Sequence, residues 1–545
     1  MSAPAASRAP GWRLALAGGA ALAVASPPAL LPGAEFLVVV GLALWFVVAT
    51  ASARPLLHSY LLGCVHMAWF AWSVRHVLWP AYVAIVVVGG LYFVFATAAT
   101  RAAPRRWAAC MFAIASAASF WLRAEMPEIC FPHGQPCHDL WQWPALLASV
   151  RVGGEPLANA LLAGVAATAV QLWRSWRLAD PAWRVARREL LIAFGAAVLA
   201  TAVGNVWRGR AATGDAARQV RVGVVEPGLH PFDPLPGASY REVFEQRWLQ
   251  PTQELLAAGA PPDLILWPES SVPDEPTEEQ LQRPRPSRSF GLPLGRALLI
   301  YGTNLRRDDH PTPIALVVGQ GGELIGWHEK QRLVPGGEFL PFLDWLPDSV
   351  NAAVYRLFQQ AMGSAPDCAP GRFRPPLTTR SGVPFGVLTC YDNAFPAPAR
   401  AQVEAGARLL CVISNEAWYR GGGELTQLVA MTVCRALENA VPVVRCTMDG
   451  WSAAVGADGK LLGHLPLRPA PQALPQKMVI DVPLAAAAQA PVPWLPAVTG
   501  PAAALLAGLA LLHSLISWAR LKTSRTATQA AAGAGVRSRS SASGS

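Results

Sequence analysis

Three residues of catalytic type follow apolar stretches at nearly even intervals along the chain. Glu269 lies in D-L-I-L-W-P-E-S, Lys330 in H-E-K-Q-R and Cys390 in G-V-L-T-C-Y-D. The glutamate and the lysine are 61 positions apart (330 − 269), and the lysine and the cysteine are 60 apart (390 − 330). A carboxylate can act as a base, a thiol as a nucleophile and an ammonium as a charge stabiliser. The three residues together therefore predict nucleophilic catalysis.

The local setting of each residue supports this chemistry, although each residue alone has a simpler explanation. Glu269 follows Trp-Pro at the end of an apolar run, and poor solvation makes a carboxylate a better base. Lys330 precedes L-V-P-G-G-E-F, where a tight turn sets Glu338 just beyond it. Cys390 directly follows an apolar run, as a nucleophile at a strand end would. The simpler explanations are a surface glutamate, a solvated lysine and a buried core cysteine.

The elements that must position these residues are short apolar strands alternating with helical stretches. This pattern extends over about 270 residues and indicates an α/β domain. The predicted helices cover 240–258 and 426–439. The predicted strands cover 220–225, 264–267, 297–301, 314–318, 385–389 and 409–413.

Composition predicts that the rest of the chain lies in a membrane. Hydrophobic residues make up 52% and charged residues only 15%, against about 25% charged in soluble proteins. Runs of about 20 apolar residues predict spanning helices. Arg75 and His76 make the third of them the weakest. The eight predicted spans cover roughly 13–31, 35–52, 57–78, 80–99, 107–122, 156–173, 189–206 and 495–518.

The positive charges predict how these spans are oriented. Arg8 and Arg13 place the N-terminus in the cytoplasm, and the basic clusters at 101–106, 174–188 and 520–525 fall on the same side if there are eight spans. The catalytic domain is then periplasmic, in the inner membrane of a bacterium. The predicted organisation is membrane helices over 1–206, a catalytic domain over 207–494, a membrane helix over 495–518 and a basic, disordered cytoplasmic tail over 519–545.

Two other partner classes are not supported by the sequence. The net charge of +10 gathers at membrane boundaries, and no nucleic-acid-binding module is present. The nine cysteines have no metal-ligand spacing, so neither a metal nor a cofactor is expected. Cys130 and Cys137 share one short polar loop, and a disulfide between them is conceivable if that loop is periplasmic.

The order Glu-Lys-Cys, with each residue at a strand end, resembles the catalytic triad of the nitrilase superfamily. This resemblance implies an α-β-β-α sandwich. Within the superfamily the chain is most similar to the apolipoprotein N-acyltransferases, which carry such a domain before the last of eight membrane helices. Further similar stretches are I-S-N-E-A-W at 413–418, R-A-L-E at 435–438 and V-V-R-C-T-M-D-G at 443–450.

The resemblance implies a ping-pong acyl transfer. A phospholipid would donate an acyl chain to the cysteine, and the N-terminal amine of a diacylglyceryl-modified apolipoprotein would receive it. A membrane-tethered amidase with the same triad and a catalytically dead scaffold are the alternatives. The residues implied to support the triad or position substrate are Glu338, Tyr391, Asp392, Asn415 and Trp418. The departures from the family pattern, expected around the substrate mouth, are Phe232, Glu416, Met448 and Asp449.

Overall fold

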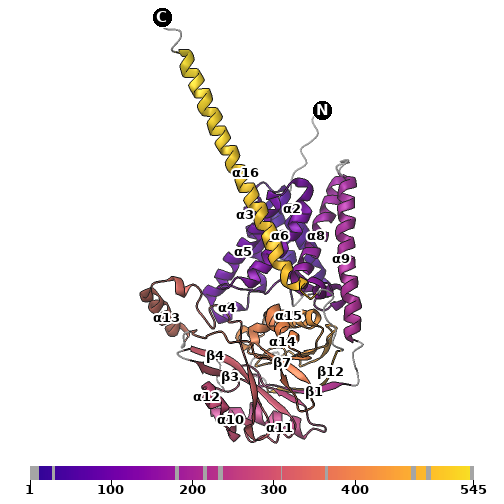
Figure 1. The fold of residues 1–545 in the computed structure, drawn as a ribbon, viewed down its shortest axis with the longest axis vertical. Helices are drawn as coiled ribbons and strands as arrows, with labels where there is room; N and C mark the ends of the chain where they lie inside the picture. Colours follow the sequence, from indigo (N-terminus) through magenta and orange to yellow (C-terminus); the bar gives the residue numbers. More distant parts are fainter. Residues whose placement is uncertain are drawn as a thin grey trace.

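The fold is described from a computed structural model of the chain. A bundle of long helices lies at one end, and a domain of strands and shorter helices lies below it (Figure 1). The described residues are 11–27, 31–177, 183–212, 218–230, 237–307, 310–362, 366–467, 474–485 and 493–540.

Helices occupy all eight places where the sequence predicts a membrane span. Within the described residues, six helices are long and apolar enough to cross a membrane. The helices α1 and α3 have 15 and 16 residues, fewer than the roughly 20 that a spanning helix needs. The helices are α1 (Gly11–Ala25), α2 (Leu37–Ala51), α3 (Pro55–Phe70), α4 (Val74–Val77), α5 (Trp79–Ala102), α6 (Ala108–Glu125), α7 (Pro144–Leu147), α8 (Val150–Arg177), α9 (Trp183–Ala212) and α16 (Leu495–Ser540).

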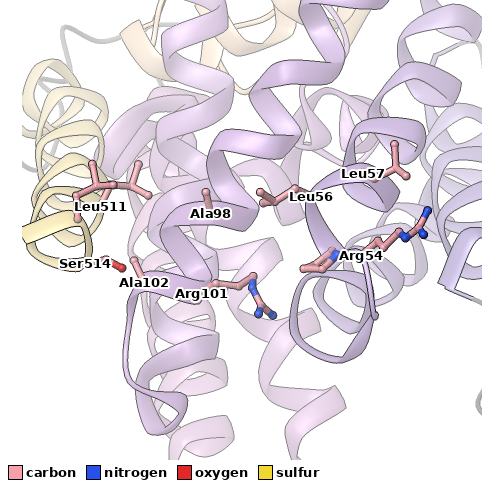
Figure 2. A pocket seen from close by; sticks show the side chains of 10 residues that line it. Arg54, Leu56, Leu57, Ala98, Arg101, Ala102, Leu511 and Ser514 are labelled. Atoms are coloured by element: carbon pink, nitrogen blue, oxygen red, sulfur yellow. The ribbon is translucent and has the colours of Figure 1, made fainter. Parts of the chain in front are cut away.

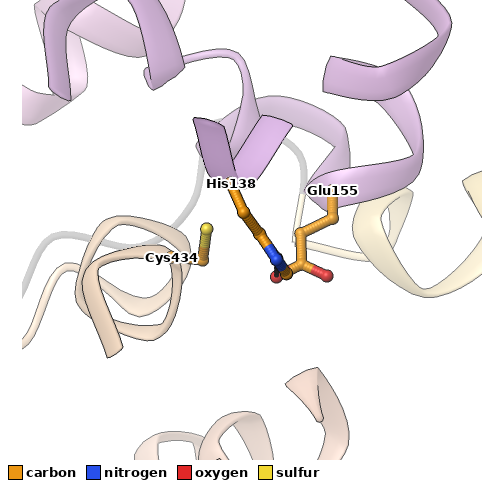
Figure 3. Close-up of side chains that lie close together, drawn as sticks. All are labelled: His138, Glu155 and Cys434. Carbon is orange, nitrogen blue, oxygen red and sulfur yellow. Dashed lines mark hydrogen bonds and ion pairs between the residues drawn. The ribbon is translucent and has the colours of Figure 1, made fainter. Parts of the chain in front are cut away.

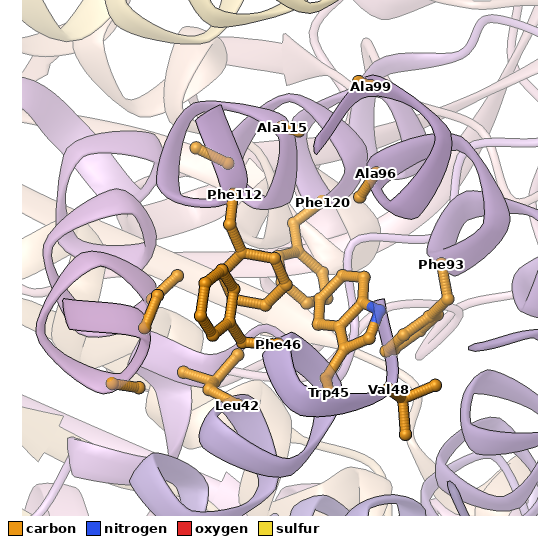
Figure 4. Packing of buried hydrophobic residues seen from close by; sticks show 14 of the residues in the cluster. Leu42, Trp45, Phe46, Val48, Phe93, Ala96, Ala99, Phe112, Ala115 and Phe120 are labelled. Carbon is orange, nitrogen blue, oxygen red and sulfur yellow. The ribbon is translucent and has the colours of Figure 1, made fainter. Parts of the chain in front are cut away.

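An aromatic cluster forms the core of the helix bundle (Figure 4). The Trp45 ring lies 4.5 Å from that of Phe93 and 5.0 Å from that of Phe112, between ring centroids. The indole N–H of Trp45 donates to Thr97 Oγ1 at 3.1 Å, so its one polar atom is satisfied within the apolar core. The bundle is therefore packed as a unit on which a second domain can rest.

The lower domain contains two six-stranded sheets with the same pattern of connections. Parallel strands occupy the middle of each sheet, and antiparallel strands flank them. The first sheet runs in the order β12 (Gln476–Pro483), β1 (Gln219–Glu226), β2 (Leu264–Leu266), β3 (Leu298–Arg307), β4 (His310–Val318) and β5 (Leu324–Glu329). The second runs β11 (Leu461–His464), β10 (Ala453–Val455), β9 (Val443–Thr447), β8 (Leu409–Ser414), β7 (Pro384–Thr389) and β6 (Leu377–Thr378).

Helices cover the outer face of each sheet, which confirms the predicted α-β-β-α sandwich. Alternate apolar residues of both sheets meet in a shared core that includes Val222 and Phe385. The remaining helices are α10 (Tyr240–Phe244), α11 (Gln250–Ala257), α12 (Glu278–Gln282), α13 (Asp348–Met362), α14 (Pro396–Glu404) and α15 (Glu424–Asn439). α10 and α11 lie on the side away from the bundle, and α15 lies on the side facing it (Figure 1).

Each predicted strand and helix of this domain is present, with ends that differ by a few residues. The helix α16 extends to Ser540, and the disorder expected for the tail after residue 519 stays a prediction. The sequence left open whether Cys130 and Cys137 form a disulfide. In the structure both cysteines are free and pack in separate apolar clusters. Phe232 lies outside the described residues.

Candidate active site

Three strand ends bring Glu269, Lys330 and Cys390 to one place between the sheets. Glu269 follows β2 after Trp267 and Pro268, while Lys330 and Cys390 directly follow β5 and β7. The turn at Glu269 packs closely on β3, because a Cβ atom at Gly302 would lie 2.5 Å from the Glu269 Cα. A glycine is therefore required there for the glutamate to reach this position.

Lys330 is fully buried and lies between two carboxylates. Its Nζ donates to Glu269 Oε1 at 2.9 Å and to Glu338 Oε1 at 2.6 Å. Burial alone would lower the pKa of Lys330, but the charges of Glu269 and Glu338 raise that pKa well above its ordinary value. Burial beside Glu269 raises the pKa of Glu338, against the attraction of Lys330. The lysine therefore keeps its positive charge in a site with little water.

Hydrogen bonds to the backbone fix both carboxylates in place. The amide N–H of Asn415 donates to Glu269 Oε2 at 3.0 Å, and that of Val334 donates to Glu338 Oε2 at 2.9 Å. Asn415, one of the predicted supporting residues, thus holds the glutamate through its backbone. Glu269 and Glu338 each use one oxygen for Lys330 and the other for a backbone amide.

Cys390 lies at a strained position at the start of a short turn. Its φ angle is +50°, and Ser270, next to Glu269, has a φ of +57°. Left-handed backbone at non-glycine residues is costly and gathers at functional sites. Burial raises the pKa of the Cys390 thiol to about 12; the Glu269 charge adds to the rise, and Lys330 opposes it. The cysteine therefore rests as a thiol and needs a base to become a nucleophile.

Asp392 joins the turn of Cys390 to the segment after Lys330. One carboxylate oxygen accepts the amide N–H groups of Gln331 and Arg332 at 3.0 and 2.8 Å, and the other accepts that of Thr389 at 3.2 Å. Burial raises the pKa of Asp392 to about 7, although these N–H groups oppose the rise. Asp392, one of the residues implied to support the triad, thus holds the turn of Cys390 against the segment that follows Lys330.

The site opens into a cavity of about 450 Å³ that shares a wall with a second, apolar cavity of about 560 Å³. Glu269, Lys330, Cys390 and the predicted Trp418 line the first cavity. Tyr391 lines both, and its hydroxyl donates to the Cys130 carbonyl at 2.9 Å. Residues of α3 and α5 complete the second cavity, notably Met67, Ala81, Ile85, Val88 and Tyr92.

Two of the departures from the family pattern are buried rather than exposed at a substrate mouth. Glu416 is fully buried, forms an ion pair with Arg445 and is among the residues that line the first cavity. Met448 packs in the apolar layer on the outer side of the first sheet. The expectation that they surround the substrate mouth is therefore wrong for the Met448 side chain, because it fills a core position instead.

Sequence patterns did not predict a contact between the helix bundle and the catalytic domain. Glu424, at the start of α15, accepts the amide N–H of Ser73, which precedes α4, at 3.1 Å. Burial raises the pKa of Glu424 to about 7, and hydrogen bonds from Ser73 oppose the rise. This contact fixes the segment that continues to Val77 and Leu78, which line both cavities. The partners are 351 positions apart, so no local motif could reveal the pair.

A second polar cluster lies where α15 packs against α8. His138, Glu155 and Cys434 have ligand-type atoms within 4.8 Å of one another (Figure 3). Arg435 already donates to Glu155 at 2.7 Å and to Glu438 at 2.8 Å, and His138 contacts Glu155 at 3.1 Å. The guanidinium supplies the positive charge that a metal ion would bring. The cluster is therefore an ion-pair network between the two domains, and it does not fit a metal centre.

The kink of α8 places Glu155 in this network. Gly153 and Gly154 leave helical geometry, and Gly154 has a φ of +72°, just before Pro156. A side chain at Gly154 would be strained in this left-handed conformation. Glu155 thus projects from a bend in α8 toward α15.

Two family models match this chain in the two regions that the fold separates. A model described as carbon-nitrogen hydrolase matches residues 238–470, and one described as the N-terminal domain of apolipoprotein N-acyltransferase matches residues 18–168. The chain is therefore a membrane protein that carries a nitrilase-type domain. In both regions the chain is similar to the apolipoprotein N-acyltransferases.

Individual relatives align with part of the chain. The apolipoprotein N-acyltransferase of Geobacter metallireducens is 34% identical over 219 residues, which cover 38% of this chain and 39% of that one. That of Sinorhizobium medicae is 26% identical over 333 residues, 58% of each. The alignments thus span less than two thirds of each relative. An amidase from Nesterenkonia sp. has 20% identity and a TM-score of 0.34, covering 50% of this chain and 94% of that one.

Proposed function

We propose that this protein transfers an acyl chain from a membrane phospholipid to the N-terminal amine of a diacylglyceryl-cysteine lipoprotein, through a thioester on Cys390. The observation that carries the proposal is the pair of adjoining cavities. One holds the Glu269, Lys330 and Cys390 side chains, and the other is apolar and lined by membrane helices. An enzyme for a small soluble amide has no need of the second cavity.

In the first half-reaction, Glu269 removes the proton of the Cys390 thiol. The thiolate sulfur attacks the ester carbonyl carbon of the phospholipid, and the carbonyl oxygen becomes an oxyanion beside the Lys330 ammonium. When the oxyanion collapses, the ester C–O bond breaks. Glu269 returns its proton to the departing lysophospholipid oxygen. The acyl chain remains on sulfur as a thioester.

In the second half-reaction, the amine of the lipoprotein attacks the thioester carbonyl. Glu269 takes a proton from the attacking nitrogen, the C–S bond breaks, and an amide forms. The sulfur then recovers its proton and the thiol is restored. The same base and the same cation serve both halves, because both pass through an oxyanion at the same carbon.

The apolar cavity supports a lipid donor by its chemistry and its position. It is lined by side chains such as Ile85, Val88 and Phe358 and adjoins the Cys390 cavity through Tyr391 and Tyr419. Moving an acyl chain from lipid into water costs about 0.8 kcal/mol for each CH₂. A cavity that joins the bilayer to the thiol avoids this cost.

We further propose that residues 207–494 lie outside the cytoplasm, in the periplasm of a bacterium. The basic residues of the helix bundle support this orientation. Arg101 lies in the last turn of α5, and Arg105 and Arg106 lie in the turn between α5 and α6. The other end of α5 follows α4, where Ser73 contacts Glu424 of the catalytic domain. Basic residues favour the cytoplasmic side of a membrane.

The test is acyl transfer by the full-length protein in phospholipid vesicles, with a diacylglyceryl-cysteine lipopeptide as acceptor. We expect mass spectrometry to show the lipopeptide with a third acyl chain linked to its amine, and a lysophospholipid in equal amount. If free fatty acid or ammonia is released and no acylated lipopeptide forms, the protein is a hydrolase and the proposed acyl transfer is wrong. No turnover of any of these substrates would favour the scaffold alternative.

A further inference from the structure

A groove of about 660 Å³ lies at the end of the helix bundle remote from the catalytic cavity. Its walls come from the start of α3, the end of α5 and the middle of α16. Figure 2 shows Arg54, Arg101 and Ser514 along one side and Leu56, Ala98 and Leu511 along the other. The groove is therefore polar on one side and apolar on the other.

The two arginines bring positive charge that the described residues do not neutralise. No ion pair joins Arg54 or Arg101 to a carboxylate within the described part of the chain, and the groove has no acidic lining residue there. Arg101 donates to the Ala49 carbonyl at 3.3 Å, which holds the guanidinium at the rim. Both side chains are exposed. The groove thus favours an anion.

The start of α3 adds to this preference. Arg54 occupies the N-cap position, its side chain makes no capping hydrogen bond, and Pro55 follows it. The first N–H groups of a helix have no acceptor within the helix, and the helix dipole places partial positive charge there. Uncapped N–H groups beside two arginines suit a phosphate.

The apolar side of the groove can hold a hydrocarbon chain. Its position along α16 places it where the acyl chains of a bilayer lie. Leu56, Leu57 and Leu515 are exposed, and the small side chains of Ala98 and Ala102 leave room between α5 and α16. Ser514 comes 19 residues after the start of α16 (514 − 495), about 29 Å along the axis at 1.5 Å per residue. This is about the thickness of the hydrocarbon core, so the groove lies at the membrane face opposite the catalytic domain.

We propose that this groove binds an anionic glycerophospholipid of the leaflet opposite the catalytic domain. Arg54, Arg101 and the start of α3 hold the phosphate, and an acyl chain lies against Leu511 and Ala98. The lipid fills the gap between α16 and the bundle, and it is separate from the acyl donor at Cys390. The inference does not depend on the proposed catalytic function.

The test is native mass spectrometry of the full-length protein after exposure to dioleoyl-phosphatidylglycerol or dioleoyl-phosphatidylcholine. The variants are Arg54→Gln with Arg101→Gln and, as a matched control, Arg105→Gln with Arg106→Gln. The control arginines are exposed on the same face and do not line the groove. We expect the wild type to retain the anionic lipid preferentially. Affinity should fall roughly fivefold for each groove arginine lost and stay near wild type in the control.

A third variant tests the apolar side. Ala98→Leu keeps both arginines but narrows the groove, so it should also reduce phosphatidylglycerol retention. Size-exclusion profiles like that of the wild type establish that each variant is folded. Equal retention by the wild type and the groove double variant would overturn the proposal. So would an equal loss in the control pair, or equal binding of the two lipids by the wild type.

Discussion

Two buried cations in this protein each lie between two carboxylates, and we propose that one acts in catalysis while the other stabilises the fold. Lys330 lies between Glu269 and Glu338 at the catalytic cavity. Arg435 lies between Glu155 and Glu438 where the two domains meet. Both clusters also have a cysteine nearby, Cys390 in one and Cys434 in the other.

The two clusters differ in whether the cysteine lines a cavity and in whether its backbone is strained. Cys390 lines a cavity and has a left-handed backbone, whereas Cys434 lies within α15 and is fully buried. Burial raises the pKa of both thiols, so charge alone does not distinguish them. A cation between two carboxylates is therefore no sufficient sign of catalysis. An accessible nucleophile beside it is the additional requirement.

The largest effect is expected from removing the proposed base. Glu269→Gln keeps the shape of the side chain and an oxygen for the Asn415 amide, but it cannot take the thiol proton. We expect acylation of Cys390 to fall by about 10²–10⁴, the usual contribution of general base catalysis. Single-turnover acylation from a labelled phospholipid measures it. A loss of less than about threefold would show that another group accepts the proton.

The equivalent change in the other cluster should affect folding. Arg435→Ala leaves Glu155 and Glu438 buried without their cation. Breaking a buried ion pair in this way costs about 3–5 kcal/mol. We expect a lower thermal midpoint by intrinsic tryptophan fluorescence in detergent, with acylation per folded molecule kept. Unchanged stability would mean that this network does not hold the domains together.

Lys330→Arg tests whether the catalytic cluster depends on the shape of its cation, because the variant keeps the positive charge but replaces the ammonium by a guanidinium. A planar guanidinium cannot occupy the position of a compact ammonium that donates to Glu269 and Glu338. We expect the rate of Cys390 acylation to fall by about 10²–10³ in Lys330→Arg, the usual effect of losing one oxyanion donor. In Lys330→Ala the acylation rate should fall at least as far. If either variant acylates at the wild-type rate, the lysine is structural, like Arg435.

The smallest effect concerns the contact between Glu424 and Ser73. Burial raises the pKa of Glu424 from 4.5 to about 7. A raised pKa contributes stability that is complete below about pH 4.5 and is lost as the pH rises through 7. Glu424→Gln keeps an acceptor for the Ser73 amide but does not titrate. The thermal midpoint of the wild type relative to this variant should therefore be higher at about pH 5 than at about pH 8. A constant difference would contradict the role of Glu424.

The sequence predicted the features of this molecule that are local. The strands that carry Glu269 and Cys390 are continuous apolar runs, which single-sequence patterns identify well. The strands β5, β6 and β9 to β12 were not predicted. Of these, β5, β11 and β12 are only partly buried, and β6 and β10 have two and three residues. β9 is fully buried and was missed as well. Contacts between distant segments were also missed. Glu155 meets Arg435 across 280 positions, and only the packing of α15 on α8 brings them together.

The most direct test of the account is whether Cys390 carries an acyl group. Full-length protein is incubated with phospholipid vesicles without an acceptor, then digested and analysed by mass spectrometry. The account predicts an acyl group on the peptide that contains Cys390, lost when a diacylglyceryl-cysteine lipopeptide is added and absent from Cys390→Ala. Cys368 lines the same cavity and serves as the internal comparison. An acyl group on Cys368, or none on any cysteine while the lipopeptide is still acylated, would contradict the account.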